Sequence, residues 1–106
     1  MMVRALTLSA SLLLACGVSH AQLRGHGGPV RALAISPDGT QAVSGSFDTS
    51  AIRWSLPRNA AEQVLRFHEG AVNAVAILKV GRIATSGEDA RIAIWTPGAA
   101  TPSLVL

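Results

Sequence analysis

Histidine, serine and aspartate occur in this sequence in an order that could support nucleophilic catalysis. His26, Ser44 and Asp48 have the side-chain types of a hydrolase triad, with Ser44 as nucleophile, His26 as base and Asp48 as the orienting carboxylate. The same types recur further along the chain, at His68, Ser86 and Asp89. Catalysis needs an exposed nucleophile beside an oxyanion site, whereas duplication favours an architectural role. We therefore predict no catalytic residue and no enzyme activity.

Metal and cofactor chemistry have little support in the residue pattern. The histidines His20, His26 and His68 lack the short spacing of metal ligands. Cys16 is the sole cysteine, so neither an internal disulfide nor a cysteine-based zinc finger can form. The sequence has no phosphate-binding glycine loop of Walker or Rossmann spacing. We predict no metal site and no cofactor in this chain.

The charge pattern argues against nucleic-acid binding. The chain of 106 residues has a formal charge of +3, with 9 Lys and Arg against 6 Asp and Glu. The arginines are dispersed, the only lysine is Lys79, and tyrosine is absent. Nucleic-acid binders usually concentrate basic and aromatic side chains on one element. We therefore expect protein partners and no nucleic acid.

The N-terminal residues have the pattern of a secretory signal peptide. Arg4 supplies a positive start, residues 5–15 are mainly apolar, and Ser19 and Ala21 are small residues at the −3 and −1 positions. This pattern predicts a signal peptide over residues 1–21, cleaved between Ala21 and Gln22. The apolar run is shorter than the roughly 20 residues that cross a membrane. We therefore expect a secreted or periplasmic product without a transmembrane span.

A lipid anchor is the alternative for the same segment. Residues 13–16, Leu-Leu-Ala-Cys, resemble a bacterial lipobox, in which the cysteine is acylated and becomes the mature N-terminus. On this interpretation Cys16 is the lipidation site. Both alternatives predict export.

The remaining sequence consists mostly of two copies of one pattern, because residues 23–56 align with residues 65–97. The landmark pairs His26/His68, Val30/Val72, Gly39/Gly81 and Ser44/Ser86 share one spacing. After a single deletion, the pairs Asp48/Asp89 and Trp54/Trp95 share a spacing that is shorter by one position. A period of about 40 to 45 residues, in which both spacings fall, is typical of a four-stranded propeller blade.

The local pattern predicts four strands in each copy. Residues 30–36 form a mostly apolar run suited to burial on both faces. A tight turn follows, in which Pro37 presets φ and Gly39 accepts a positive φ. Further strands are expected at residues 22–24, 41–46, 51–55, 62–67 and 101–106. Each four-stranded unit needs neighbouring units to cover its apolar faces.

At these residues the sequence resembles the WD-repeat (Trp-Asp repeat) β-propeller family. The resemblance implies an all-β fold: a partial β-propeller of two four-stranded antiparallel blades, after an N-terminal helical signal segment. The blades would occupy residues 22–64 and 65–106. The family's structural hydrogen-bond network would comprise His26, Ser44, Asp48 and Trp54, then His68, Ser86, Asp89 and Trp95. Such a network gives buried polar atoms their partners.

Several positions depart from the family pattern. The Trp-Asp dipeptide is replaced by Trp54-Ser55 and Trp95-Thr96, and the second Gly-His pair by Phe67-His68. The third strand of the first copy places Ile52 and Arg53 one step off the apolar pattern that Ile92 and Ile94 show in the second copy. These departures weaken individual blades but leave the family resemblance intact.

The resemblance also implies a function. Propellers usually close with four to eight blades, so two blades suggest a fragment that is poorly stable or self-associates through its exposed faces. We expect an exported, non-catalytic protein-interaction scaffold that binds protein partners or further blades. Arg31 and Phe47 are candidates for its contact face, with ordinary rim residues as the alternative interpretation. The alternative is the propeller portion of a periplasmic c-type cytochrome, whose haem would belong to a missing C-terminal domain. The Cys-x-x-Cys-His motif of such a domain does not occur in this sequence.

Overall fold

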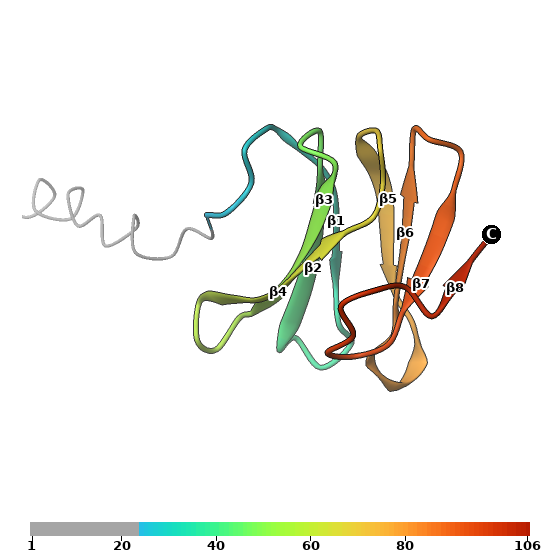
Figure 1. Ribbon diagram of the computed structural model, residues 1–106. Helices are drawn as coiled ribbons and strands as arrows, with labels where there is room; N and C mark the ends of the chain where they lie inside the picture. Colours follow the sequence, from blue (N-terminus) through green and yellow to red (C-terminus); the bar gives the residue numbers. More distant parts are fainter. Residues whose placement is uncertain (1–23) are drawn as a thin grey trace, which may run out of the picture.

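The computed structural model describes residues 24–106, which form two four-stranded antiparallel sheets packed face to face (Figure 1). The predicted signal peptide, the cleavage site at Ala21 and Gln22, and Cys16 lie outside the described residues. None of the helical segments in residues 24–106 is long and apolar enough to cross a membrane.

The first sheet has its strands in chain order, because short turns join neighbours that pair as hairpins. Its strands are β1 (Val30–Ile35), β2 (Gln41–Ser46), β3 (Ser50–Ser55) and β4 (Ala60–Arg66). The second strand coincides with the prediction. The third begins one residue earlier than predicted, and the fourth is shifted toward the N-terminus.

The second sheet repeats this arrangement. Its strands are β5 (Val72–Ile77), β6 (Ile83–Gly87), β7 (Ile92–Trp95) and β8 (Leu104–Val105), and the 3-10 helix η1 (Lys79–Gly81) joins the first two. The predicted outer strand in residues 101–106 is thus a short strand paired with β7. The prediction of an all-β fold with two four-stranded antiparallel blades is confirmed.

The turns after β1 and β5 differ in their backbone. In the first turn the Asp38 carboxylate accepts hydrogen bonds from the hydroxyl groups of Ser36 and Thr40, and Gly39 has a φ of 73°. In the second turn Val80 has a φ of 52°, in the left-handed region that a β-branched residue rarely adopts. The second turn is therefore the more strained of the two.

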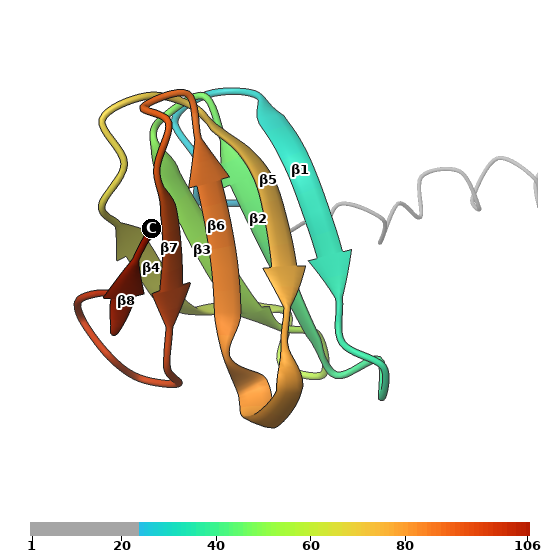
Figure 2. The same cartoon turned by 90° about the vertical axis from the view of Figure 1, so that its right-hand side faces the viewer.

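The main core lies between the two sheets. Buried apolar side chains meet there from β2, β3, β4, β6 and β7: Val43, Ala51, Leu65, Ile83, Ala93 and Trp95. Trp95 is fully buried, and burial of an aromatic side chain of this size stabilises the fold by roughly 5 kcal/mol at most. Figure 2 shows β5 lying between β1 and β6, where the two sheets are in contact.

Gly45 lets the sheets approach closely. A Cβ atom at this position would lie 2.6 Å from Cγ1 of Val72 and 3.1 Å from Cγ1 of Val75. The position one repeat later is Ser86, because Gly45 pairs with Ala32 as Ser86 pairs with Ala74. The second sheet packs directly against Gly45 in the first blade, whereas no sheet of residues 24–106 packs against Ser86 in the second blade.

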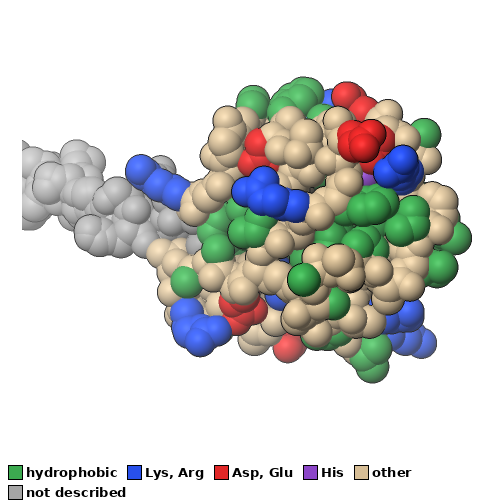
Figure 3. Space-filling model, in the orientation of Figure 1, with side chains coloured by type: hydrophobic (Ala, Val, Ile, Leu, Met, Phe, Trp, Pro, Cys, Tyr) green, Lys and Arg blue, Asp and Glu red, His purple; other side chains and the backbone are tan. Residues whose placement is uncertain are grey.

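Each sheet leaves one face without a covering sheet. On the first sheet this face carries a second buried cluster of Ala42, Ile52 and Trp54. Leu33, in β1, is 63% exposed, and Ile35 is 58% exposed. The prediction that the first strand is buried on both faces was wrong, because no sheet in the described part of the chain covers the face of the first sheet on which Trp54, Leu33 and Ile35 lie. Figure 3 shows further apolar side chains gathered over the second sheet.

Candidate functional site: the two blade networks

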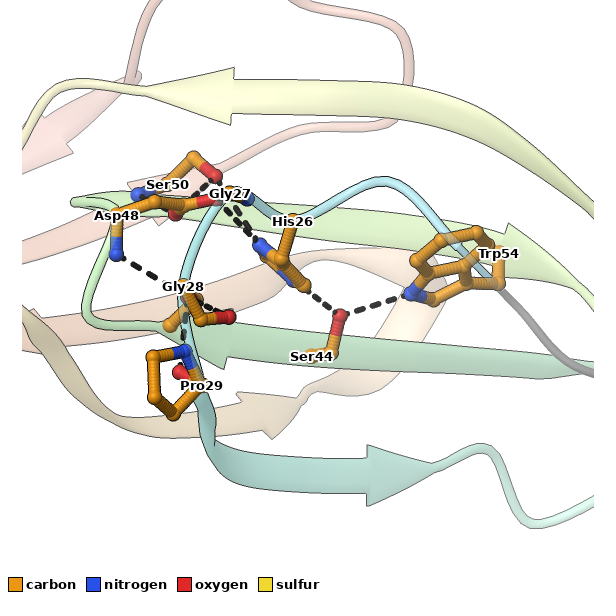
Figure 4. A network of polar contacts seen from close by, with 9 residues as sticks. His26, Gly27, Gly28, Pro29, Ser44, Asp48, Ser50 and Trp54 are labelled. Atoms are coloured by element: carbon orange, nitrogen blue, oxygen red, sulfur yellow. Dashed lines mark hydrogen bonds and ion pairs between the residues drawn. The ribbon is translucent and has the colours of Figure 1, made fainter.

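The first blade contains a chain of hydrogen bonds that runs from an indole to a carboxylate (Figure 4). Nε1 of Trp54 donates to Oγ of Ser44 at 2.8 Å. Oγ of Ser44 lies 2.7 Å from Nε2 of His26, and Nδ1 of His26 lies 3.0 Å from Oδ2 of Asp48. Because a carboxylate can only accept, Nδ1 of His26 donates to Asp48, and in the Nδ1–H tautomer of the imidazole Nε2 accepts the hydroxyl proton of Ser44. One hydroxyl and one imidazole thus connect the indole N–H of Trp54 to the carboxylate of Asp48.

Asp48 anchors this network to the backbone. Its carboxylate also accepts the N–H of Gly27 at 2.8 Å, the N–H of Ser50 at 2.9 Å and the Ser50 hydroxyl at 2.6 Å. Burial alone would raise the pKa of Asp48. The hydrogen bonds, those from Ser50 above all, outweigh burial and hold this pKa far below its ordinary value. The turn between β2 and β3 is thus tied to the segment before β1.

The second blade has the same chain with a threonine in place of the serine. Nε1 of Trp95 donates to Oγ1 of Thr85 at 3.1 Å, and Nε2 of His68 lies 2.8 Å from the same oxygen. Nδ1 of His68 lies 3.0 Å from Oδ1 of Asp89. Burial opposes ionisation of Asp89, but the N–H of Glu69 and the contact with His68 outweigh it and lower its pKa.

The prediction of Ser86 as the hydroxyl of the second network was wrong by one residue. Ser86 points to the opposite face of β6 from Thr85, because successive strand residues alternate. The deletion between the two copies falls in the turn before β6, since Ala42 pairs with Trp54 as Ile83 pairs with Trp95. After this turn, equivalent residues of the two copies are separated by the same shorter spacing as Asp48 and Asp89, so the equivalent of Ser44 is Thr85. Counting four residues back from Asp89, as from Asp48 to Ser44, would have found Thr85.

The network of the first blade has the order of contacts of a catalytic triad, but its serine is fully engaged. Ser44 is only 4% exposed, and its oxygen already accepts the indole N–H of Trp54. A nucleophile needs access to substrate and a nearby oxyanion site. The arrangement is suited to satisfying buried polar groups.

The described residues contain no cluster of three or more His, Cys, Asp and Glu side chains that could hold a metal ion. Each histidine has one ring nitrogen at a carboxylate and the other at a hydroxyl group, and Nδ1 of His26 also lies 3.3 Å from Oγ of Ser50. Both ring nitrogens of each histidine are therefore already used within its own blade.

A polar contact also links the two blades at their rim. The guanidinium of Arg31 lies 4.8 Å from the ring centroid of Phe47, and its NH1 lies 3.4 Å from Oε2 of Glu88. All three side chains are partly exposed to solvent. Arg31 and Phe47 were candidate contact residues from sequence. Glu88 follows β6 at the place that Phe47 has after β2, and only the packing of the sheets brings it to Arg31.

Comparison with known proteins agrees with this architecture. The family model described as "WD domain, G-beta repeat" matches residues 17–55 and 60–96. The methylosome protein WDR77 of Xenopus laevis is 39% identical over 72 residues, which are 66% of this chain and 22% of that protein. The small ribosomal subunit protein RACK1y of Oryza sativa subsp. japonica is 35% identical over 82 residues, 74% of this chain and 24% of that protein.

This chain spans less than a quarter of the length of these two relatives. The family model covers most of the chain and every strand of the two sheets except β8. The chain therefore belongs to the WD-repeat family.

Proposed function

We propose that this protein is a non-catalytic protein-interaction scaffold built from two consecutive propeller blades. The observation that carries the proposal is the double network, in which the polar side chains capable of chemistry bind one another. Membership of the WD-repeat family supports the scaffold role, because WD-repeat domains mediate contacts between proteins. The rim formed by Arg31, Phe47 and Glu88 is partly exposed and lies at the edge of the sheets, so it stays accessible when their faces are covered.

Further four-stranded blades are the proposed occupants of the two open faces. On the first sheet the open face carries Leu33, Ile52 and Trp54, and their equivalents Val75, Ala93 and Trp95 pack against the first sheet. The contact between the two blades therefore supports the proposal that a preceding blade covers the face of the first sheet on which Trp54 lies. These further blades could come from a longer chain or from a second molecule.

A closed ring of identical copies is disfavoured by one side chain. An exact repeat of the internal packing would set Val30 of a second copy against Ser86, as Val72 is set against Gly45. The space at Gly45 has no room for a Cβ atom, and serine brings one. Copies of this chain would therefore associate through these faces in a less regular way.

Sedimentation of the full chain over a range of concentrations tests the open faces. We expect concentration-dependent association, which Leu33→Glu and Ile92→Glu should each weaken by placing a charge on an apolar face. Val80→Glu is the matched control, since Val80 is exposed in a turn. A monomeric wild-type chain with a sharp two-state melt would contradict the proposal.

Labelling with a fluorophosphonate tests the non-catalytic part of the proposal. This probe reacts with activated serines, so we expect no label on Ser44. A stoichiometric label on Ser44 that disappears in His26→Ala would show a working nucleophile and refute this part.

Export through residues 1–21 is also part of the proposal. The mass of the product made in a bacterial host would show cleavage before Gln22, or acylation at Cys16 if the lipobox alternative holds. An unprocessed N-terminus would contradict both. The cytochrome alternative stays a prediction, for which the test is a haem absorbance band in the native product.

A further inference from the structure

Arg53 is a charged residue at a strand position that is aliphatic in the second blade. It lies in β3, opposite Val43 of β2 and Gln63 of β4. The equivalent position in the second blade, next to Trp95 as Arg53 is next to Trp54, is Ile94 in β7. An aliphatic side chain therefore suits this position of the blade, and the arginine is a feature of the first blade alone.

The side chain of Arg53 is buried but weakly bound. Arg53 is 6% exposed. Its NH1 donates to Oε1 of Gln41 at 3.4 Å and its NH2 donates to the carbonyl oxygen of Gly81 at 3.2 Å. Both distances exceed the roughly 2.7–2.9 Å typical of hydrogen bonds from charged groups to carboxylates. Nε is buried and has no partner.

No ion pair compensates this charge among residues 24–106. Taking a guanidinium out of water is unfavourable unless an opposite charge and good hydrogen bonds replace the lost hydration. The neutral amide of Gln41 and one carbonyl oxygen do not supply the opposite charge. The guanidinium of Arg53 therefore has no anionic partner among residues 24–106.

Arg53 lines a cleft of about 350 Å³ between the two blades. The other lining residues are Glu62 and Gln63 of β4 and Pro97 and Gly98 after β7. This volume is within the range of small-ligand sites. Glu62 is already engaged, because its Oε2 lies 2.6 Å from NH2 of Arg58.

We propose that this cleft binds a carboxylate through the guanidinium of Arg53. A planar carboxylate can accept two parallel N–H groups from a guanidinium, which is the strongest pairing open to arginine. A singly charged group also suits the cleft better than a phosphate dianion, because Glu62 lies on the same wall. The carboxylate belongs either to an acidic side chain of a partner protein or to a free small acid. This inference does not depend on the scaffold role.

Nuclear magnetic resonance of the full chain tests the site directly. The Nε–Hε signal of Arg53 is identified by its absence in Arg53→Ile. It is then followed during titration with sodium acetate, with chloride used to hold the ionic strength constant. We expect a saturable shift of this signal and a rise in Tm with acetate. An N-acetylated, C-amidated Gly-Glu-Gly peptide is the second probe.

Three variants separate binding from structure. Arg53→Ile copies the second blade, so it should melt at or above the wild-type temperature in the absence of acetate and should lose at least about tenfold in acetate affinity, which is about 1.4 kcal/mol. Arg53→Lys keeps the charge without the planar fork and should weaken binding less. Arg66→Gln, at an exposed arginine at the end of β4, should bind acetate like the wild type.

The outcomes are distinct. Binding of both probes supports the site and points to an acidic side chain of a partner, whereas binding of acetate alone supports a site for a free small acid. The proposal is overturned if neither probe gives a saturable shift. It is also overturned if Arg53→Ile and Arg53→Lys both keep the wild-type acetate affinity, or if both melt well below the wild type, which would make Arg53 a structural residue.

Discussion

Replacement of Thr85 by valine is the sharpest test of the second blade network. Thr85→Val keeps the shape of the side chain, so it opens no cavity, but it removes the oxygen that binds Nε1 of Trp95 and Nε2 of His68. Both groups are buried and would lose their partner. Each unsatisfied buried group costs about 1–3 kcal/mol, so the two groups together should lower the free energy of unfolding by about 2–6 kcal/mol.

Urea denaturation of the full chain, followed by tryptophan fluorescence and far-UV circular dichroism, measures this loss. With a slope of about 1 kcal/mol per M, a loss of about 3 kcal/mol lowers the midpoint by about 3 M. For a chain at the low end of ordinary marginal stability, about 5 kcal/mol, this change would leave only about 2 kcal/mol.

Ser86→Ala is the matched control, because Ser86 is the hydroxyl that the repeat spacing favoured. Ser86 lies on the open face of β6, where its hydroxyl takes no part in the network, so we expect a change within about 0.5 kcal/mol. The assignment of Thr85 to the network would be refuted if Ser86→Ala cost as much as Thr85→Val. It would also be refuted if the cost of Thr85→Val stayed within the small range expected for the control.

Three further predictions concern the packing, the strained turn and the response to acid. Gly45→Ala should destabilise the fold by about 1–3 kcal/mol in the same urea assay, because the added Cβ meets Val72; an unchanged midpoint would show that the sheets do not pack this closely. Val80→Asn should raise the free energy of unfolding by about 1 kcal/mol, since asparagine tolerates positive φ; a destabilised variant would mean that the turn differs. The lowered pKa of Asp48 predicts stability that is complete above the unfolded-state pKa of about 3.9 and is lost as the pH falls toward the lower folded-state pKa. Asp48→Asn should therefore be less stable near neutral pH and lose less on acidification, and parallel curves of stability against pH for the two proteins would contradict this.

Much of the architecture could be predicted because its determinants are local. Hairpins join neighbouring strands, so the alternation of apolar residues and the turn at Pro37 and Gly39 indicate the strands with little need of distant contacts. The network of the first blade follows for the same reason, since Ser44 and Trp54 lie on neighbouring strands, Asp48 lies in the turn between them and His26 lies in the segment just before β1. The register of the second network could not be fixed by counting from Ser44, because a deletion within a turn can be placed at several positions along the alignment.

The sequence by itself determined that the chain repeats, that each repeat forms a four-stranded sheet, and that each sheet has its own His, hydroxyl, Asp and Trp chain. Only the tertiary structure decided which hydroxyl closes the second chain, that β1 is exposed, that Arg31 reaches Glu88, and that Arg53 is buried without a counter-charge. The physical reason is that hydrogen bonding within a hairpin depends on neighbours in sequence, whereas burial and charge compensation depend on what the next sheet places against each face.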